Sequence, residues 1–291
     1  MDWTDRRERL RSIIASKRCI YPASVFDPIS ARIAEDLGFE AGIFAGSIAS
    51  FTVLGAPDII LLTLSEFAQQ AYRINRAGKL PLLVDADHGY GNALNVKRTV
   101  EELETAGVAG ITIEDTLLPT AYGAMSATLI PIAEGVGKMK AAIAGRQDKR
   151  LVIVGRTSAM AISGVEDTIA RLKAYEDAGV DMLFMVGVKT RAQLDAVAAA
   201  VKLPLFLGGA GAELYDLDYL SARHVSVCLQ GHLPFMAAVN AVHETLKALR
   251  NGIPPAQIKG IASADLMKQV TRHADYATWS KDFLHADLAG G

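Results

Sequence analysis

The sequence predicts a parallel (β/α)8 barrel of the TIM type, an α/β fold, preceded by one helix and followed by further helices. The first observation is a repeat, in which a short apolar run, a polar or glycine-rich break and a helix-like stretch recur eight times. The second is that these runs are near-continuous and rich in Val, Ile and Leu, as strands buried on both faces are. The third is the lack of a Gly-x-Gly-x-x-Gly motif after the first run, which disfavours an open doubly wound sheet.

The expected strands and helices alternate along the chain. The strands are expected at about 19–26, 41–45, 80–84, 109–113, 151–155, 182–186, 204–207 and 225–229. The helices between and after them are expected at about 29–37, 65–77, 93–106, 133–144, 165–178, 191–200, 214–221 and 235–250. Asp27 and Pro28 suit the cap and the first position of a helix. Gly38, Gly107 and Gly179 each suit a helix C-terminus before the next strand.

The chain is interpreted as one domain with helical additions at both ends. Its 291 residues are enough for one large barrel, so we expect a single barrel domain over 1–291. An amphipathic helix is expected within about 1–18, and a helical extension over about 252–291. The extension has too little apolar surface to stand alone, so it must pack on the barrel or on a neighbouring subunit.

Composition excludes several classes of function. The chain is 51% hydrophobic and 21% charged with a net charge of -2, which is ordinary for a soluble globular protein. Lys and Arg are scattered, which argues against nucleic acid, and no apolar run is long enough to cross a bilayer. The first residues lack the order of a signal peptide, so we expect a cytoplasmic protein. Cys19 and Cys228 lie in apolar contexts and read as packed, reduced thiols, although their number alone leaves a catalytic thiol open.

The most informative stretch follows the third expected strand and reads Val-Asp-Ala-Asp-His-Gly-Tyr-Gly-Asn over residues 84–92. Asp85 and Asp87 are spaced i, i+2, which on a strand puts both carboxylates on one face. Carboxylate oxygens are what hard divalent cations bind. The alternative is a turn and capping cluster, because Asp, Gly and Asn are common after any strand.

A barrel would bring further polar residues to the same place, because the C-terminal ends of its strands share one mouth. Those ends hold Ser47, Asp85, Asp87, Glu114, Asp115, Arg156 and His232. Acids buried together repel one another, and a divalent cation relieves that repulsion. Since Mg²⁺ keeps water ligands and takes one or two direct carboxylates, we expect Asp85 to bind it directly, with Asp87 and Glu114 working partly through water.

The remaining polar residues each have two interpretations. Arg156 is either a bidentate clamp for a substrate carboxylate or phosphonate, or an ion-pair partner of a mouth acid. His232 either binds substrate or merely begins a helix. Ser47 either offers its hydroxyl to an anion or caps a turn. His88 is either an acid–base or supporting group, or a solvent-exposed loop residue.

These residues resemble the isocitrate lyase / phosphoenolpyruvate mutase superfamily. The motifs that carry the resemblance are Ser-Val-Phe-Asp at 24–27, Gly-Ser at 46–47, Asp-Ala-Asp-His-Gly-Tyr-Gly-Asn at 85–92, Ile-Glu-Asp at 113–115 and Gly-Arg-Thr at 155–157. The resemblance covers nearly the whole chain. It implies a Mg²⁺-dependent barrel that acts on α-keto or α-hydroxy acids, in which C–C or P–C bonds break or form next to an enolate. It also implies a homotetramer whose C-terminal helices are exchanged between subunits.

Within the superfamily, the loop after the fourth strand separates the branches. Here residues 115–123 read Asp-Thr-Leu-Leu-Pro-Thr-Ala-Tyr-Gly, without the cysteine of the isocitrate and methylisocitrate lyases and without the Lys and Asn-Ser of the mutases. The chain looks most like the oxaloacetate decarboxylase branch, whose substrate and metal residues match Ser47, Asp85, Arg156 and His232. Two departures are Gly-Gly-Ala at 208–210, where a larger side chain is expected, and Ser158 in place of a frequent Asn.

The resulting hypothesis is Mg²⁺-assisted decarboxylation of oxaloacetate, or of a close β-keto diacid, to pyruvate and CO₂ through an enolate, with Mn²⁺ as a possible substitute for Mg²⁺. Asp85, Arg156 and His232 are the expected catalytic residues; Ser47, Arg156 and His232 bind substrate; Asp85, Asp87 and Glu114 serve the metal. The alternative is a lyase for a 2-alkylmalate or related 2-hydroxy acid. A P–C bond enzyme and a non-catalytic binding barrel are weaker readings.

Overall fold

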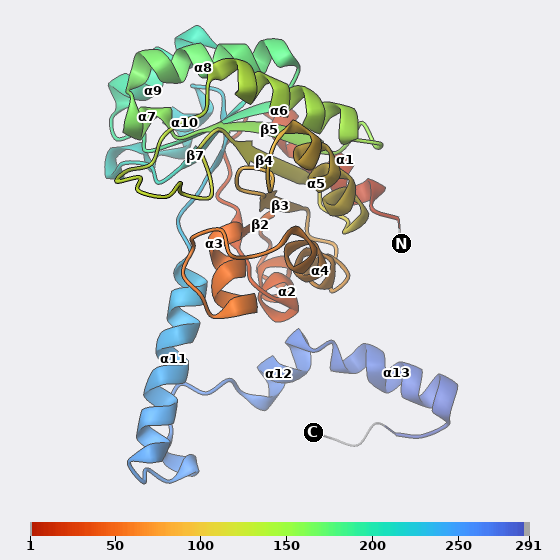
Figure 1. Cartoon of the computed structure of the whole chain (residues 1–291). Helices are drawn as coiled ribbons and strands as arrows, with labels where there is room; N and C mark the ends of the chain where they lie inside the picture. Colours follow the sequence, from red (N-terminus) through yellow and green to blue (C-terminus); the bar gives the residue numbers. More distant parts are fainter. Residues whose placement is uncertain (1, 288–291) are drawn as a thin grey trace. The chain divides into compact units, whose positions relative to one another are not determined.

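The computed structural model describes residues 2–287 and contains an eight-stranded, all-parallel sheet in which each strand pairs with its sequence neighbours (Figure 1). The strands are β1 (Ala23–Ser24), β2 (Gly42–Ala45), β3 (Leu82–Asp85), β4 (Gly110–Glu114), β5 (Val152–Thr157), β6 (Met182–Val186), β7 (Leu205–Gly208) and β8 (Val225–Cys228). A parallel bridge between Ile20 and Val227 joins the segment before β1 to β8. The curled sheet is therefore consistent with the predicted TIM-like barrel.

Helices lie outside this sheet, between successive strands (Figure 1). They are α1 (Thr4–Ala15), α2 (Pro28–Asp36), α3 (Gly46–Ala49), the π-helix η1 (Ser50–Leu54), α4 (Leu64–Asn75), α5 (Ala93–Thr105), α6 (Ile132–Gly145), α7 (Ala159–Ile162), α8 (Val165–Ala178), α9 (Arg191–Ala200), the 3₁₀-helix η2 (Ala212–Leu214) and α10 (Leu217–Ser221). The positions of the main helices agree with the prediction to within a few residues.

Local capping explains why the helices begin and end where they do. The side chain of Asp27 accepts a hydrogen bond from the backbone of Ser30, with Pro28 at the first position of α2. Gly38 and Gly179 have φ angles of 82° and 94°, in the left-handed region that glycine adopts without strain. The predicted cap residues are thus confirmed.

Two parts of the prediction were wrong in detail. The helix expected at 214–221 is η2 followed by α10, since Asp216 caps a new helix by accepting a hydrogen bond from the Tyr219 backbone. The short helices α3, η1 and α7 directly after β2 and β5 were not foreseen. They are too short for a 3.6-residue apolar period to be visible in the sequence.

The interior of the barrel is filled by apolar side chains. Phe184 of β6 and Phe206 of β7 stack with ring centroids 4.0 Å apart, and both are almost fully buried. Met182 is fully buried in the same cluster. Cys19 and Cys228 are free and buried, and burial raises the pKa of each thiol to about 12. Both cysteines are packed thiols, and the pKa disfavours a nucleophilic thiolate.

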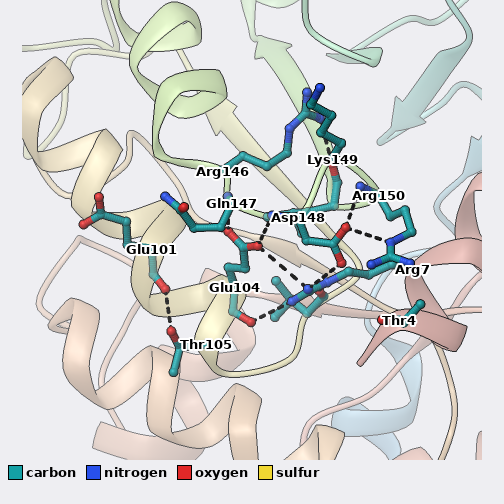
Figure 2. A network of polar contacts seen from close by, with 12 residues as sticks. Thr4, Arg7, Glu101, Glu104, Thr105, Arg146, Gln147, Asp148, Lys149 and Arg150 are labelled. Atoms are coloured by element: carbon teal, nitrogen blue, oxygen red, sulfur yellow. Dashed lines mark hydrogen bonds and ion pairs between the residues drawn. The ribbon is translucent and has the colours of Figure 1, made fainter. Parts of the chain in front are cut away.

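At the N-terminal ends of the strands, a polar network ties α1 to α5 and to the segment before β5 (Figure 2). The Arg7 guanidinium donates to Asp148 at 2.9 Å and to the carbonyls of Glu104 and Val108 at 2.7 and 3.1 Å. The Glu104 carboxylate accepts from the backbone of Asp148 at 2.6 Å. We call these residues, with Gln147 and Arg150, the base network. Each of its charged groups has an opposite charge or a backbone dipole beside it.

The chain divides into two compact units, one up to Leu233 and one from Pro234 onward. The second unit contains most of α11 (Leu233–Arg250), then η3 (Pro255–Gln257), α12 (Ala264–Val270) and α13 (His273–Leu284). The α11 helix has no buried residue. No helix among residues 2–287 combines the length and apolarity needed to cross a membrane.

Candidate active site

A cavity of about 520 Å³ opens among the C-terminal ends of the strands, where the barrel prediction places the mouth. Its lining includes every residue predicted to bind metal or substrate, namely Ser47, Asp85, Asp87, Glu114, Arg156 and His232. Asp115 is the exception among the mouth residues. It is fully buried and accepts hydrogen bonds from Tyr175 and Arg171 at 2.6 and 3.1 Å. Asp115 therefore belongs to the support behind the cavity.

Arg156 lies between two of the acids. Its guanidinium forms ion pairs with Asp85 and with Glu114, the second at 3.2 Å. Burial acts to lower the pKa of Arg156, but the two carboxylates outweigh it and the pKa is raised, so the group stays charged. The ion-pair interpretation of Arg156 is thus correct for the protein without ligand. Its buried Nε has no hydrogen-bond partner, which leaves donor capacity for an anion.

The two partners of Arg156 are each oriented by a threonine. Thr112 donates to Asp85 at 2.7 Å, and Thr116 donates to Glu114 at 3.0 Å. Burial raises the pKa of Glu114, and Arg156 opposes that shift only in part. The hydroxyls and Arg156 together fix both carboxylates: Asp85 has one oxygen on Thr112 and the other on Arg156, and one oxygen of Glu114 takes both Thr116 and Arg156.

Asp87 is held differently. Its φ of 48° is left-handed, and its backbone carbonyl accepts a hydrogen bond from Glu114 at 2.8 Å. A Cβ placed on Gly46 would lie 2.5 Å from the Asp87 carboxylate, so only glycine fits beside it. Burial, and then Asp85 and Glu114, raise the pKa of Asp87 well above the ordinary value of an aspartate. The cluster therefore holds more carboxylate charge than Arg156 can neutralise.

His232 follows β8 and also lines the cavity, and its ring Nδ1 lies 2.8 Å from the Ser24 hydroxyl of β1. Burial lowers the pKa of His232, while Asp85 and Asp58 act to raise it. The neutral ring that results can present its other nitrogen to a ligand. Ser24 was part of the recognised motif, but its role as the partner of His232 needed the structure.

Ser47 lies in the first turn of α3, directly after β2, and is partly exposed to the cavity. Its hydroxyl and the nearby backbone are compatible with the predicted contact to an anion. His88, in contrast, is buried and does not line the cavity, and Lys138 donates to its backbone carbonyl at 2.8 Å. The solvent-exposed reading of His88 was wrong, and its ring lies outside the cavity lining.

Sequence reasoning missed several lining residues, because they come from loops without a motif. Asp58, Ile59 and Ile60 belong to the loop between η1 and α4, and Tyr215 follows η2. Burial raises the pKa of Asp58, and the negative charge of Asp85 raises it further. Asp58 therefore interacts electrostatically with the acids of the cavity. An acid in the long loop that follows β2 and η1 could have been found only from the barrel geometry.

The long segment after β4 forms a hairpin with a paired stem. Thr116 bridges Leu129 in antiparallel fashion, and the Leu117 backbone donates to Thr128 at 2.8 Å. Leu118 and Thr120 beyond this stem line the cavity, whereas Tyr122 is exposed. This loop after β4 therefore lies over one side of the mouth.

The donor set fits a hard divalent cation. Four carboxylates, those of Asp58, Asp85, Asp87 and Glu114, line one cavity. Three of them have raised pKa values, and the Arg156 guanidinium forms ion pairs with two of the four. Among residues 2–287, no three His, Cys, Asp or Glu side chains gather closely enough to hold a metal by themselves. That arrangement fits Mg²⁺ with one direct carboxylate and water as its other ligands, since Mg²⁺ dehydrates reluctantly.

Comparison with known proteins identifies the family to which this chain belongs. Residues 10–250 match the family model described as phosphoenolpyruvate phosphomutase, and the chain belongs to that family, as the resemblance indicated. Among its relatives, an oxaloacetate decarboxylase of Bradyrhizobium diazoefficiens is 60% identical over 98% of this chain and 99% of its own length. The prediction of a carbon–carbon lyase of the carboxy-lyase type is confirmed at this level of similarity.

Two solved structures show the same fold. One is oxaloacetate acetylhydrolase in complex with 3,3-difluorooxalacetate, with a TM-score of 0.84 and 27% identity over 95% of this chain and 97% of the other. The other is phosphonopyruvate hydrolase with oxalate and Mg²⁺, with a TM-score of 0.85 and 27% identity over 96% of this chain and 99% of the other. Both proteins are similar to this chain over nearly its full length.

Proposed function

We propose that this protein is a Mg²⁺-dependent decarboxylase of oxaloacetate, or of a close β-keto diacid, and that it releases pyruvate and CO₂. The observation that carries the proposal is Arg156, which is shared between Asp85 and Glu114 in a cavity that His232 also lines. The similarity to the Bradyrhizobium oxaloacetate decarboxylase supports this substrate. The cavity of about 520 Å³ has ample room for a four-carbon diacid.

In this proposal the acids bind the keto end of the substrate through the metal, and Arg156 and His232 bind its distal carboxylate. Asp85 would hold the metal directly, with Asp87 and Glu114 orienting its water ligands. Bound Mg²⁺ would act as a Lewis acid and stabilise the negative charge that develops on the keto oxygen. Arg156 and His232 would hold the distal carboxylate, and Ser47 would donate to the substrate near the metal end.

The reaction then needs no nucleophile from the protein. The C–C bond to the distal carboxylate breaks, CO₂ leaves, and the electron pair remains on the pyruvate enolate, which takes up one proton. The hairpin at 116–131 would close over the mouth and exclude water, as catalytic lids do. Its lack of a cysteine fits a reaction that uses no loop thiol as an acid.

Direct measurement of CO₂ tests the proposal. Protein treated with EDTA is supplied with oxaloacetate and Mg²⁺, and CO₂ and pyruvate are read separately above the rate with Mg²⁺ alone. We expect both products in equal amounts, with Mn²⁺ also active. Absence of CO₂ would overturn the assignment, and a keto acid formed from a 2-alkylmalate without CO₂ would support the lyase alternative. Asp85→Asn, which keeps the side-chain shape, is the matched inactive control.

The second unit is proposed to serve assembly. Within α11, Met236, Val239, Val242, Leu246 and Leu249 are exposed and recur at three- and four-residue steps, which makes one apolar helix face. Exposed apolar faces of this kind are usually covered by a partner. We therefore propose a homotetramer in which these helices are exchanged between subunits of one barrel domain each, located in the cytoplasm. Light scattering at several concentrations measures the oligomer.

A further inference from the structure

The wall of the cavity at β7 is made of backbone. Gly208 and Gly209 both line the cavity. A Cβ on Gly208 would lie 2.9 Å from the Phe184 ring and from Val186, so a larger residue has no room there. Gly209 has a φ of 58° and nothing within 4 Å of the place where a Cβ would be. This strand end therefore contributes no side chain to a ligand, and it leaves open space beside Gly209.

Among the large side chains that line the cavity, Tyr215 is the nearest to this wall along the chain, six residues beyond Gly209. The residue is 43% exposed. Its hydroxyl donates to the Leu229 carbonyl at 3.2 Å, and the Tyr21 ring lies against it with centroids 6.1 Å apart. Tyr215 thus supplies the aromatic surface that the strand end lacks.

The segment that carries Tyr215 is well held. Gly211 donates its backbone N–H to Val188 at 2.8 Å, and the neighbouring Leu214 is fully buried. On the other side, Asp216 caps α10 and pairs with Arg191 at 3.0 Å. These anchors on both sides limit the positions that the ring can take.

Tyr215 also contacts the segment that carries His232. Leu229, whose carbonyl accepts from Tyr215, precedes His232 by three residues, and its own N–H donates to Leu207 of β7 at 2.9 Å. The Tyr215 hydroxyl therefore bridges the loop after β7 to the loop after β8. The proposed function places the substrate's distal carboxylate at His232, which this segment carries, and so places C3 near it.

We infer that Tyr215 determines substrate specificity by closing the cavity beside Gly209 and so limiting the size of the group at C3. The inference rests on the proposed function for the identity of the substrate. A pocket wall of this kind discriminates between substrates that differ by one methyl group about tenfold or more. Tyr215 excludes the larger substrate with its ring, and its hydroxyl keeps the His232 segment in place.

The test compares Tyr215→Ala, Tyr215→Phe and wild type on oxaloacetate and 3-methyloxaloacetate. We expect Tyr215→Ala to raise kcat/KM for the methylated substrate relative to oxaloacetate by about tenfold. Tyr215→Phe keeps the ring and should keep the wild-type ratio, with a higher KM for both substrates. Tyr219→Phe, whose hydroxyl contacts Asp195 rather than the cavity, is the matched control. An unchanged ratio in active Tyr215→Ala would overturn the inference.

A binding measurement separates this inference from the proposed function. Calorimetry with Mg²⁺ present gives the Kd of oxalate, which is too short to reach Tyr215, and of 2-oxoglutarate, which is longer than oxaloacetate. Tyr215→Ala should tighten 2-oxoglutarate about tenfold and leave oxalate within about twofold. Wild type that releases no CO₂ refutes the proposed function, whereas an unchanged ratio of the two Kd values refutes the role of Tyr215. Tyr215→Leu replaces Tyr215→Ala if that variant fails to fold.

Discussion

Both ends of the barrel carry charged groups with little exposure to solvent. At one end these charges are neutralised by partners, and at the other end they are not. In the base network, Arg7 faces Glu104 and Asp148, and hydrogen bonds hold the pKa of Asp148 at about 2 although burial acts to raise it (Figure 2). At the mouth, Arg156 cannot neutralise the acids around it, and the pKa of Asp87 is raised. The base network stabilises the fold, whereas the mouth keeps unneutralised acids whose use is to bind something positive.

The largest effect is expected at the mouth, from Asp85→Asn. The amide keeps the shape of the side chain and its contact with Thr112, but removes the charge proposed to bind the metal. We expect Mg²⁺-dependent decarboxylation to fall by about 1,000-fold. Steady-state rates at saturating Mg²⁺ measure this, and a variant within tenfold of wild type would remove Asp85 from the mechanism.

The next largest effect is expected at the base, from Arg7→Ala. This change leaves the buried Glu104 without its guanidinium and the half-buried Asp148 with Arg150 alone, so the free energy of unfolding should fall by about 3 kcal/mol. Arg98→Ala, which removes an exposed ion pair with Glu102 on α5, should change it by less than about 0.5 kcal/mol. Urea unfolding measures both variants. If both variants lost the same free energy of unfolding, the base network would contribute no more to stability than an exposed ion pair does.

The pH dependence of the free energy of unfolding should show the contribution of Asp148 to the base network. Because the pKa of Asp148 is lowered from 3.8 to about 2, its stabilising effect is present above pH 3.8 and lost as pH falls through 2. Wild type should therefore lose an advantage of about 2 kcal/mol over Asp148→Asn between pH 5 and pH 2. Unfolding free energies at several pH values check this, and a constant gap between the two proteins contradicts it.

The smallest effect is expected from Asp87→Asn. This change should increase the free energy of unfolding, whereas Arg7→Ala decreases it. A raised pKa means that the charged form of Asp87 destabilises the metal-free fold, increasingly as pH rises through that pKa. Removing the charge should stabilise EDTA-treated protein at pH 7.5 by about 1 kcal/mol while lowering activity. Thermal unfolding with EDTA measures it. A loss of stability would mean that Asp87 is not part of an overcharged cluster.

The same contrast explains what the sequence could predict. The strand repeat and the acids Asp85, Asp87 and Glu114 could be predicted from local pattern, and these acids lie in one cavity of the structure. The pairing of His232 with Ser24 and the approach of Asp58 and Tyr215 join distant segments, and no period in the sequence encodes them. The base network was missed for the same reason, because Arg7 and Asp148 look like ordinary surface charges until α1 is placed.

The most direct test of this account is the Mg²⁺ dependence of thermal stability in EDTA-treated wild type and Asp85→Asn. Binding to the folded state alone should add about 2.7 kcal/mol at a Mg²⁺ concentration 100 times the Kd. The account predicts that wild type gains this stability and that Asp85→Asn gains almost none. An equal gain in both proteins, or none in wild type, would contradict the claim that the acids at the mouth form a cation site.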